Sequence, residues 1–297
     1  MIYQTPDALD IHLDALPALP RPSRVVLTTP THFDVEYVIN PHMSDNVGTV
    51  NTEVAWQQWK ALRATYTALD RAPIVVNGQA GLPDMVFCAN QTLPFYTPNT
   101  DTKGVVLSRM HSPERADEVP YYARFFEERG YAVKSLPADL DADFEGMGDA
   151  LWHPSHRLLW GGYGYRTSPE AYEALSDLLD VPVVLLRLTD PDYYHLDTCL
   201  CPLDANHALV APEAFDETGR ALIDALFDTP IEVPDHEARH QFACNAHSPD
   251  GTHVLIQEGC EETNNRLRTH DFVPVELDTS EFMKAGGSVF CMKQMIW

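Results

Sequence analysis

The sequence predicts an α/β fold, because short apolar runs that suit strands alternate with longer segments of helical periodicity. This strand, helix, strand pattern recurs about five times, at intervals of roughly fifty residues. No low-complexity linker interrupts the 297 residues, so we expect a single domain over 1–297, with an irregular, proline-containing lead-in at 1–23. Periodicity alone leaves open whether the strands form one open sheet or several separate blades.

The first predicted strand covers residues 24–28, and a helix at 52–69 follows because its large apolar residues share one face. A helix at 114–129 ends at Gly130, and Ser168-Pro169-Glu170 supplies the cap, proline and acidic start of another. The remaining predicted strands lie at 74–76, 85–87, 105–107, 158–160, 183–188, 208–210, 254–257 and 272–277. The remaining predicted helices lie at 212–227, 235–243 and 261–269.

Charge and composition exclude several classes of function. Acidic residues outnumber basic ones by 44 to 20, which disfavours nucleic acid and anionic membranes as partners. The longest apolar run, 181–186, is too short to span a bilayer, and the first residues lack the features of a signal peptide. Six cysteines are too few for a disulfide scaffold in a chain of this size. We therefore expect a cytoplasmic protein with reduced thiols.

The most informative segment is Gly286-Gly287-Ser288-Val289-Phe290-Cys291 near the end of the chain. A thiolate is a strong nucleophile, and the two glycines allow the backbone to turn sharply or to approach a ligand closely. Taken alone, Cys291 is better explained as a buried packing residue of the final strand, since free cysteine is among the most buried residue types. Evidence that Cys291 is catalytic must therefore come from other residues in the sequence.

Two further segments carry groups for acid–base chemistry. In Phe144-Glu145-Gly146-Met147-Gly148-Asp149, two carboxylates are separated by glycines, which indicates a tight turn with close ligand approach rather than a helix. In Tyr194-His195-Leu196-Asp197-Thr198, an extended chain puts His195 and Asp197 on one face. A histidine beside a carboxylate can act as acid and base, although a hydrogen-bonded structural histidine is the simpler alternative.

Four other polar residues stand at strand ends or in turn-like contexts. Asp84 enters the predicted strand at 85–87 and Asn90 lies beyond its end, while Arg109 and Arg166 each follow a strand. Each is weak evidence by itself, because most arginines in so acidic a protein are surface ion-pair partners.

A competing pattern is His236-Glu237-Ala238-Arg239-His240, which places two histidines one helical turn apart with a glutamate beside the first. Zinc proteases use this arrangement, and Glu258, Glu261 or Glu262 could supply a third ligand. Five-residue patterns recur by chance, and Pro234 makes the helix short. A zinc hydrolase based on His236 and His240 therefore remains the more distant alternative.

Together, these candidates resemble the guanidino-group-modifying superfamily, which comprises arginine deiminases, dimethylarginine hydrolases and amidinotransferases. The resemblance runs from Asn40-Pro41-His42-Met43 to Cys291. Its most specific parts are Phe-Glu-Gly-x-Gly-Asp, His-Leu-Asp-Thr and Gly-Gly-Ser-x-x-Cys. Membership implies a five-bladed α/β propeller of the pentein type, with the active site on its central axis and no cofactor or metal.

The resemblance also implies roles for these residues. Cys291 attacks the guanidino carbon, and Glu145 and Asp197 hold the guanidinium along its edges. His195 protonates the leaving nitrogen and then deprotonates the water that hydrolyses the thiouronium intermediate. The expected substrate-binding residues are Asn40 near the α-amine, Arg109 and Arg166 on the carboxylate, and Asp84, Asn90 and Asp197.

Asn90 bears on how far the reaction goes. The segment Val86-Phe87-Cys88-Ala89-Asn90 is similar to the bacterial arginine dihydrolases, whereas dimethylarginine hydrolases carry Glu-Asp at the last two positions. An amide can donate to the ureido oxygen and retain citrulline for a second attack. We therefore expect arginine to give ornithine, CO2 and two NH3. The alternatives are an arginine deiminase or dimethylarginine hydrolase that yields citrulline, and a catalytically silent homologue. The expected partner is a small guanidino substrate, and a homo-oligomer is a further possibility.

Overall fold

The computed structural model describes residues 1–297 and contains five units in which a helix connects two parallel strands. In chain order the units are β3 (Arg24–Thr28), α1 (Thr52–Ala68) and β4 (Pro73–Val76); β6 (Thr102–Leu107), α2 (Val119–Glu127) and β7 (Ala132–Lys134); β10 (Leu159–Tyr163), α4 (Pro169–Leu179) and β11 (Val183–Arg187); β13 (His207–Val210), α5 (Glu217–Leu226) and β14 (Thr229–Glu232); and β15 (His253–Gln257), α7 (Glu261–Thr269) and β16 (Val273–Leu277). The predicted α/β class and its fivefold recurrence are confirmed.

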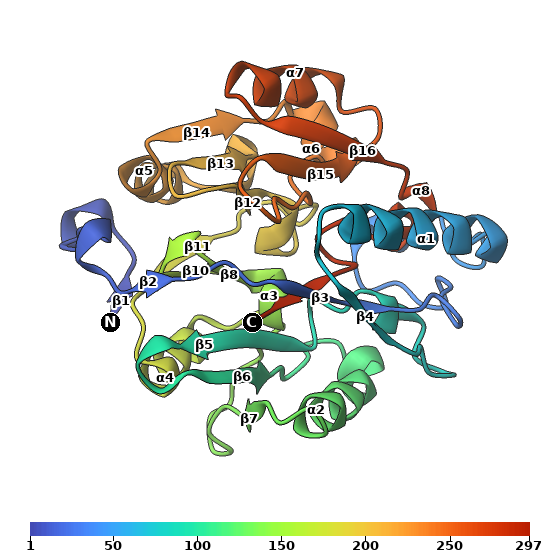
Figure 1. The fold of residues 1–297 in the computed structure, drawn as a ribbon, viewed down its shortest axis with the longest axis horizontal. Helices are drawn as coiled ribbons and strands as arrows, with labels where there is room; N and C mark the ends of the chain where they lie inside the picture. Colours follow the sequence, from blue (N-terminus) through green and yellow to red (C-terminus); the bar gives the residue numbers. More distant parts are fainter.

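Additional strands complete these units as separate small sheets. Antiparallel strands join four of them, namely β17 (Gln294–Ile296) on β3, β5 (Thr92–Thr97) on β6, β8 (Ala150–Trp152) on β10 and β12 (Leu200–Pro202) on β13. Near the N-terminus, β1 (Ile2–Tyr3) pairs with β11, and β2 (Ala18–Leu19) pairs with β9 (Ser155–His156). Figure 1 shows the helices of the five units towards the outside and the short helix α3 (Gly146–Asp149) near the middle.

Local sequence explains where these elements begin. The Asn51 side chain accepts hydrogen bonds from two backbone N–H groups in the first turn of α1, and the Asp216 side chain accepts one from Gly219 in the first turn of α5. On α5, the residues at helical spacing, Leu222, Ile223 and Leu226, are buried against the sheets. No helix has both the length and the apolar character needed to cross a bilayer.

Some predicted elements are wrong in type. Residues 83–86 form a 3₁₀ helix instead of the strand predicted at 85–87, and Pro83 suits its first turn. The helix predicted from residue 114 starts as a 3₁₀ segment, Pro113–Glu118, and becomes α-helical at Val119, just before Pro120. The acidic glycine segment contains the single-turn helix α3 rather than a simple turn. His195 has extended backbone but precedes a 3₁₀ turn, Leu196–Thr198, so the chain is not extended as far as Asp197.

Candidate active site

Cys291 lies in a buried turn that precedes β17, not in the final strand. Its Sγ lies 3.2 Å from Oδ2 of Asp197 and 3.2 Å from Nδ2 of Asn245. The Oδ1 of Asn245 accepts from the backbone N–H of Ser288 at 2.9 Å and of Cys291 at 3.3 Å. Asn245 therefore holds both the thiol and the turn that carries it, a role that no motif in the sequence predicted.

Cys291 and Asp197 affect each other's protonation. Burial raises the pKa of the Cys291 thiol well above its usual value, and the Asp197 carboxylate raises it further. Burial also raises the pKa of Asp197 to about 7, although the hydrogen bond from Cys291 opposes this. The thiol therefore keeps its proton and donates a hydrogen bond to Asp197.

His195 is held by Glu145. Its Nε2 lies 2.7 Å from Oε2 of Glu145, and both side chains are buried. Because a carboxylate accepts hydrogen bonds, Nε2 carries the proton in the neutral ring and Nδ1 has a free lone pair. Burial disfavours ionised Glu145, but the hydrogen bond from His195 and the charge of Arg166 outweigh it, so the pKa of Glu145 lies well below its usual value.

The glycines of α3 allow close approach between side chains of the site. A Cβ at Gly148 would lie 2.4 Å from Nδ2 of Asn90 and 3.1 Å from the ring of His195. Gly146 has a positive φ of 53°, and a Cβ there would lie 2.6 Å from the backbone oxygen of Asn90. The close approach expected from these glycines is therefore present, and it brings Asn90 beside His195.

Several buried polar atoms of the candidate site residues lack a hydrogen-bond partner. They are Oδ1 and Oδ2 of Asp84, Nδ2 of Asn90, Nδ1 of His195 and Oδ1 of Asp197. Burial raises the pKa of Asp84, with Arg115 opposing the shift. Buried polar groups are rarely left unpaired, because each costs roughly 1–3 kcal/mol. Carboxylate acceptors beside one amide donor and one imidazole nitrogen suit a planar, cationic ligand with several N–H groups.

Arg115 fixes the orientation of Asn90. Its Nη1 donates to Oδ1 of Asn90 at 2.9 Å, and its Nη2 lies 2.9 Å from Oε2 of Glu118. Burial disfavours the charge of Arg115, but Glu118 and Asp84 outweigh this effect and raise its pKa. Because Oδ1 of Asn90 is occupied, its amide nitrogen is the group left for a ligand. No sequence pattern pointed to Arg115 beyond its place in a predicted helix.

Of three further residues expected to bind substrate, two line one pocket and the third does not. Arg166 donates to Oε2 of Glu145 at 3.1 Å and to the carbonyl of Ile39 at 2.6 Å, and it lines a pocket of about 330 Å³. Asn40 lines the same pocket, with its Nδ2 bound to the carbonyl of Ala285 at 3.0 Å. Arg109 does not line it, because its guanidinium binds backbone carbonyls of Pro137, Leu140 and Ala142.

Two contacts in the structure also differ from those that the sequence led us to expect. Both oxygens of Glu145 are already hydrogen-bonded, to His195, to Arg166 and to the backbone N–H of His111, so this carboxylate has no edge free for a guanidinium. The expected pairing of His195 with Asp197 is replaced by the pairing of His195 with Glu145, because the 3₁₀ turn redirects the two side chains.

The zinc alternative does not fit the positions of its residues. His236 and His240 are exposed, whereas Glu237 is buried and accepts from the backbone N–H groups of Glu262 and Thr263 at the start of α7. No group of three or more His, Cys, Asp or Glu side chains lies close enough to hold a metal ion. Glu237 thus caps a helix and is not a general base beside a metal.

The chain matches one family of proteins over nearly its full length. Residues 21–297 match the sequence model of the family described as N,N dimethylarginine dimethylhydrolase, eukaryotic. The chain is 39% identical over 272 residues to the bifunctional arginine dihydrolase/ornithine cyclodeaminase ArgZ of Synechocystis sp., a match that covers 91% of this chain and 37% of ArgZ. It is 37% identical to the N(G),N(G)-dimethylarginine dimethylaminohydrolase of Mycobacterium tuberculosis, a match that covers 92% of this chain and 85% of that enzyme.

Crystal structures of the N-terminal domain of ArgZ share the fold. They match with a TM-score of 0.85 and 37% identity, covering 92% of this chain and 97% of theirs. One is a cysteine-to-serine mutant bound to substrate, and another is an asparagine-to-serine mutant covalently bound to a reaction intermediate. The present chain therefore corresponds to one domain of that longer protein.

Proposed function

Since the chain belongs to the N,N dimethylarginine dimethylhydrolase family, we propose that it hydrolyses the guanidino group of arginine through a covalent thiouronium on Cys291, as an arginine dihydrolase. The observation that carries this proposal is the set of unpaired buried atoms on Asp84, Asn90, His195 and Asp197, the last of which contacts the thiol of Cys291. They match the charge and N–H groups of a guanidinium. The cyclodeaminase activity of ArgZ is not transferred, since this chain spans 37% of that relative.

Substrate binding supplies the charge that forms the nucleophile. Asp84 and Asp197 receive the N–H groups of the guanidinium, in place of the pair of Glu145 and Asp197 expected from the sequence. The cation opposes the effects of burial and of Asp197 on the pKa of Cys291, so the thiol loses its proton as arginine binds. The unpaired Nδ1 of His195 accepts that proton.

The thiolate then attacks the guanidino carbon, and His195 gives its proton to the leaving nitrogen, which departs as ammonia. Glu145 holds the imidazole in place through Nε2 during this transfer. Neutral His195 next takes a proton from water, whose oxygen attacks the thiouronium carbon. Release of the Cys291 thiolate then leaves citrulline.

Asn90 retains citrulline for a second cycle. Its amide nitrogen has no partner and faces the site, because Arg115 occupies the amide oxygen. A donor at this position suits the ureido oxygen, whereas a carboxylate would repel it. A second attack releases the second ammonia, and hydrolysis leaves a carbamate that decays to ornithine and CO2. In total, arginine and two waters give ornithine, CO2 and two NH3.

The α-carboxylate and α-amine of the substrate point into the pocket lined by Asn40 and Arg166. Arg166 provides the cation there. Arg109 is assigned a substrate role only if its guanidinium leaves the carbonyls of residues 137–142. In its present position it orders the segment before Glu145, since its backbone pairs with Phe144.

For the fold, the proposal is a single catalytic domain built as a five-bladed α/β propeller. Five parallel strand–helix–strand units, four of them with an added antiparallel strand, support this arrangement. The helices at the outside in Figure 1 are consistent with blades around a common axis. The cytoplasmic location and the homo-oligomer stay predictions.

A product assay tests the function. Purified protein with arginine is expected to form ornithine and ammonia in a ratio of one to two, with little free citrulline. Formation of one citrulline for each arginine consumed would indicate a deiminase instead of a dihydrolase. Turnover of dimethylarginine alone would favour the activity named for the mycobacterial relative. If the protein formed no product from any of these substrates, it would not be a guanidino hydrolase.

A further inference from the structure

A second pocket lies behind the turn that carries Cys291. Phe290 and Lys293, on either side of Cys291 in the chain, line this pocket, and it shares no lining residue with the pocket at Asn40 and Arg166. Its other walls come from the N-terminal lead-in, from Trp152 and from the last residue, Trp297. Its volume is about 100 Å³, which suits a small molecule rather than a dinucleotide.

Lys293 is the unusual group in this pocket. Its side chain is 1% exposed, and its Nζ lies 3.1 Å from the centre of the Phe290 ring, with no hydrogen bond or ion pair to any side chain. Burial lowers the pKa of Lys293 to about 7, and the acidic groups around it only partly oppose this shift. A buried amine that makes no hydrogen bond or ion pair is costly, so its retention indicates a partner from outside the chain.

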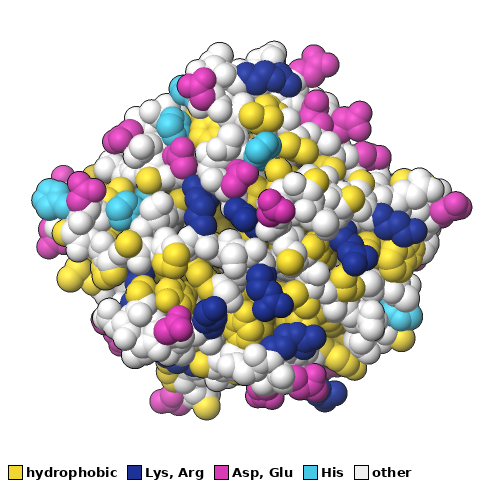
Figure 2. Space-filling view, viewed as in Figure 1, with side chains coloured by type: hydrophobic (Ala, Val, Ile, Leu, Met, Phe, Trp, Pro, Cys, Tyr) yellow, Lys and Arg dark blue, Asp and Glu magenta, His cyan; other side chains and the backbone are white.

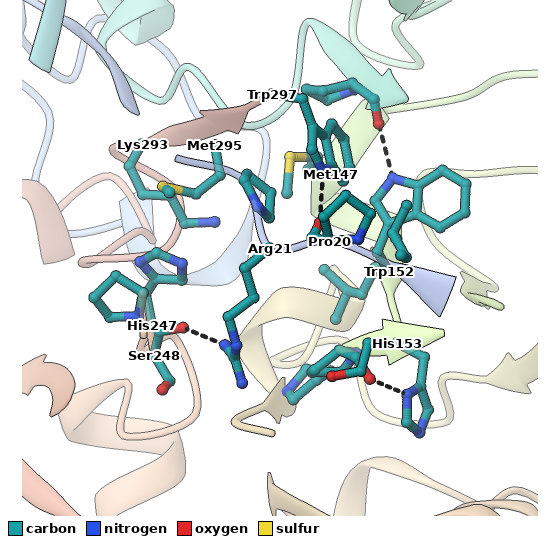
Figure 3. Close-up of a pocket in the computed structure, with 18 of the residues that line it drawn as sticks. Pro20, Arg21, Met147, Trp152, His153, His247, Ser248, Lys293, Met295 and Trp297 are labelled. Carbon is teal, nitrogen blue, oxygen red and sulfur yellow. Dashed lines mark hydrogen bonds between the residues drawn. The ribbon is translucent and has the colours of Figure 1, made fainter. Parts of the chain in front are cut away.

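The rest of the pocket is positive and apolar. None of its lining residues is acidic, although Asp and Glu outnumber Lys and Arg by 44 to 20 in the chain. Arg21 crosses it and binds only the backbone oxygens of Leu203 and Ser248. Burial lowers the pKa of His247, another lining residue, well below its usual value, and the charges of Lys293 and Arg21 add to this. Lys293 and His247 lie on one side, the two tryptophans on the other, and Arg21 between them (Figure 3).

The surface around the pocket has the same character. The C-terminus of the chain, at Trp297, lies near the middle of the view in Figure 1, and Trp297 contributes to the pocket. In the same view, Lys and Arg side chains gather around the middle of the face, while most Asp and Glu lie nearer its edge (Figure 2). An anion is therefore attracted to this part of an otherwise acidic protein.

We propose that the pocket between Lys293 and Arg21 binds a small carboxylate with a short apolar body. The carboxylate pairs with the ammonium of Lys293 and the guanidinium of Arg21, and the apolar body contacts Phe290 and the tryptophans. Arginine and ornithine are excluded, since their cationic ends meet two positive charges and no acid. The site is thus separate from the proposed reaction and stands whether or not that reaction is correct.

Thermal unfolding of the full chain with isovalerate tests the proposal, with neutral isovaleramide and cationic isopentylamine as matched probes. Isovalerate is expected to raise the midpoint in a concentration-dependent way, and the amide and amine are not. Lys293→Met, which keeps an apolar chain of similar length, should abolish the shift. Lys103→Met, at an exposed lysine, should retain it.

Arg21→Gln keeps the test decisive if Lys293→Met does not fold, and it should raise the dissociation constant for isovalerate at least about tenfold by calorimetry. An equal shift with isovaleramide would overturn the proposal. Loss of the shift in Arg166→Gln would do so as well, because it would assign the ligand to the other pocket. Failure of the arginine assay leaves all of these binding outcomes unaffected.

Discussion

Nε2 of His195 lies 2.7 Å from Oε2 of Glu145, and Nη1 of Arg166 lies 3.1 Å from the same oxygen. One carboxylate oxygen therefore links the histidine of the site to the arginine at the pocket. This link leaves Nδ1 of His195 as the free nitrogen of the ring. It also makes Glu145 a residue that positions His195, with no free oxygen for a substrate.

Replacing Glu145 with Gln should lower kcat for ammonia release by about 10²–10⁴-fold, because the uncharged amide holds His195 less firmly and does not stabilise its protonated form. KM should change much less, since Glu145 has no free oxygen for the substrate. Steady-state ammonia release measures both constants, and Glu145→Asp should recover part of kcat. Asp143→Asn is the control, because Asp143 binds the half-exposed His111 instead. A Glu145→Gln enzyme with more than a tenth of the kcat would contradict this role.

Replacing Asn90 with Asp should change the product from ornithine to citrulline. A carboxylate beside Arg115 favours the cationic guanidinium but repels the ureido oxygen, so citrulline leaves before the second attack. The ratio of citrulline to ornithine, measured by chromatography during arginine turnover, should rise at least about tenfold. Asn77→Asp, the same change at an exposed position, should leave the ratio unchanged. If Asn90→Asp still formed ornithine as the unaltered protein does, Asn90 would not determine which product is released.

Much of the fold was predictable because it depends on local patterns. Helical periodicity and short apolar runs identified three of the five units completely, with α1 and β3 at nearly the observed bounds. In the other two units the second strand, β7 or β14, was missed. The error at 85–87 has a physical reason, since a short apolar run suits any buried segment and does not by itself distinguish a strand from a 3₁₀ turn. The strand β5, which follows this turn, contains Pro94 and has no regular alternation, and it was missed.

The candidate site was predictable where a residue belongs to a recognisable segment, as with Cys291, His195 and Glu145. Asn245 and Arg115 were missed because their roles depend on contacts between segments far apart in the chain. Asn245 contacts the thiol across 46 positions, and Arg115 contacts Asn90 across 25. The contact between Glu145 and His195 was missed for the same reason, because it spans 50 positions.

Cys291 should react slowly with iodoacetamide at neutral pH in the free protein. Burial and the Asp197 carboxylate raise the pKa of the thiol, so the reactive thiolate is scarce until the solution is strongly alkaline. Asp197→Asn removes the charge and should speed alkylation at pH 8 by about tenfold or more. Mass spectrometry of the peptide that contains Cys291 measures the rate, and Asp139→Asn, at an exposed position, is the control. Rapid alkylation of the unaltered protein at pH 7 would show a thiolate already formed without substrate.

Asp197→Asn should also stabilise the protein at pH 8 while it abolishes turnover. Burial raises the pKa of Asp197 from 3.8 to about 7, so the folded state binds this proton more tightly than the unfolded state does. The contribution of Asp197 to stability is therefore present below pH 3.8 and is lost as the pH rises from there to about 7. Above pH 7 the unaltered protein therefore carries a buried charge whose cost the asparagine variant avoids.

Because one pKa unit corresponds to about 1.4 kcal/mol, we expect the free energy of unfolding of Asp197→Asn to exceed that of the unaltered protein by at least about 1 kcal/mol at pH 8. Asparagine can still accept the hydrogen bond from the Cys291 thiol, so the packing of the site is kept. Urea unfolding at pH 8 and at pH 4 measures the difference, which should nearly vanish at the lower pH. Asp139→Asn should show no such pH dependence. A variant that is less stable than the unaltered protein at pH 8 would mean that the ionised carboxylate of Asp197 stabilises the free protein, and that substrate binding does not supply its counter-charge.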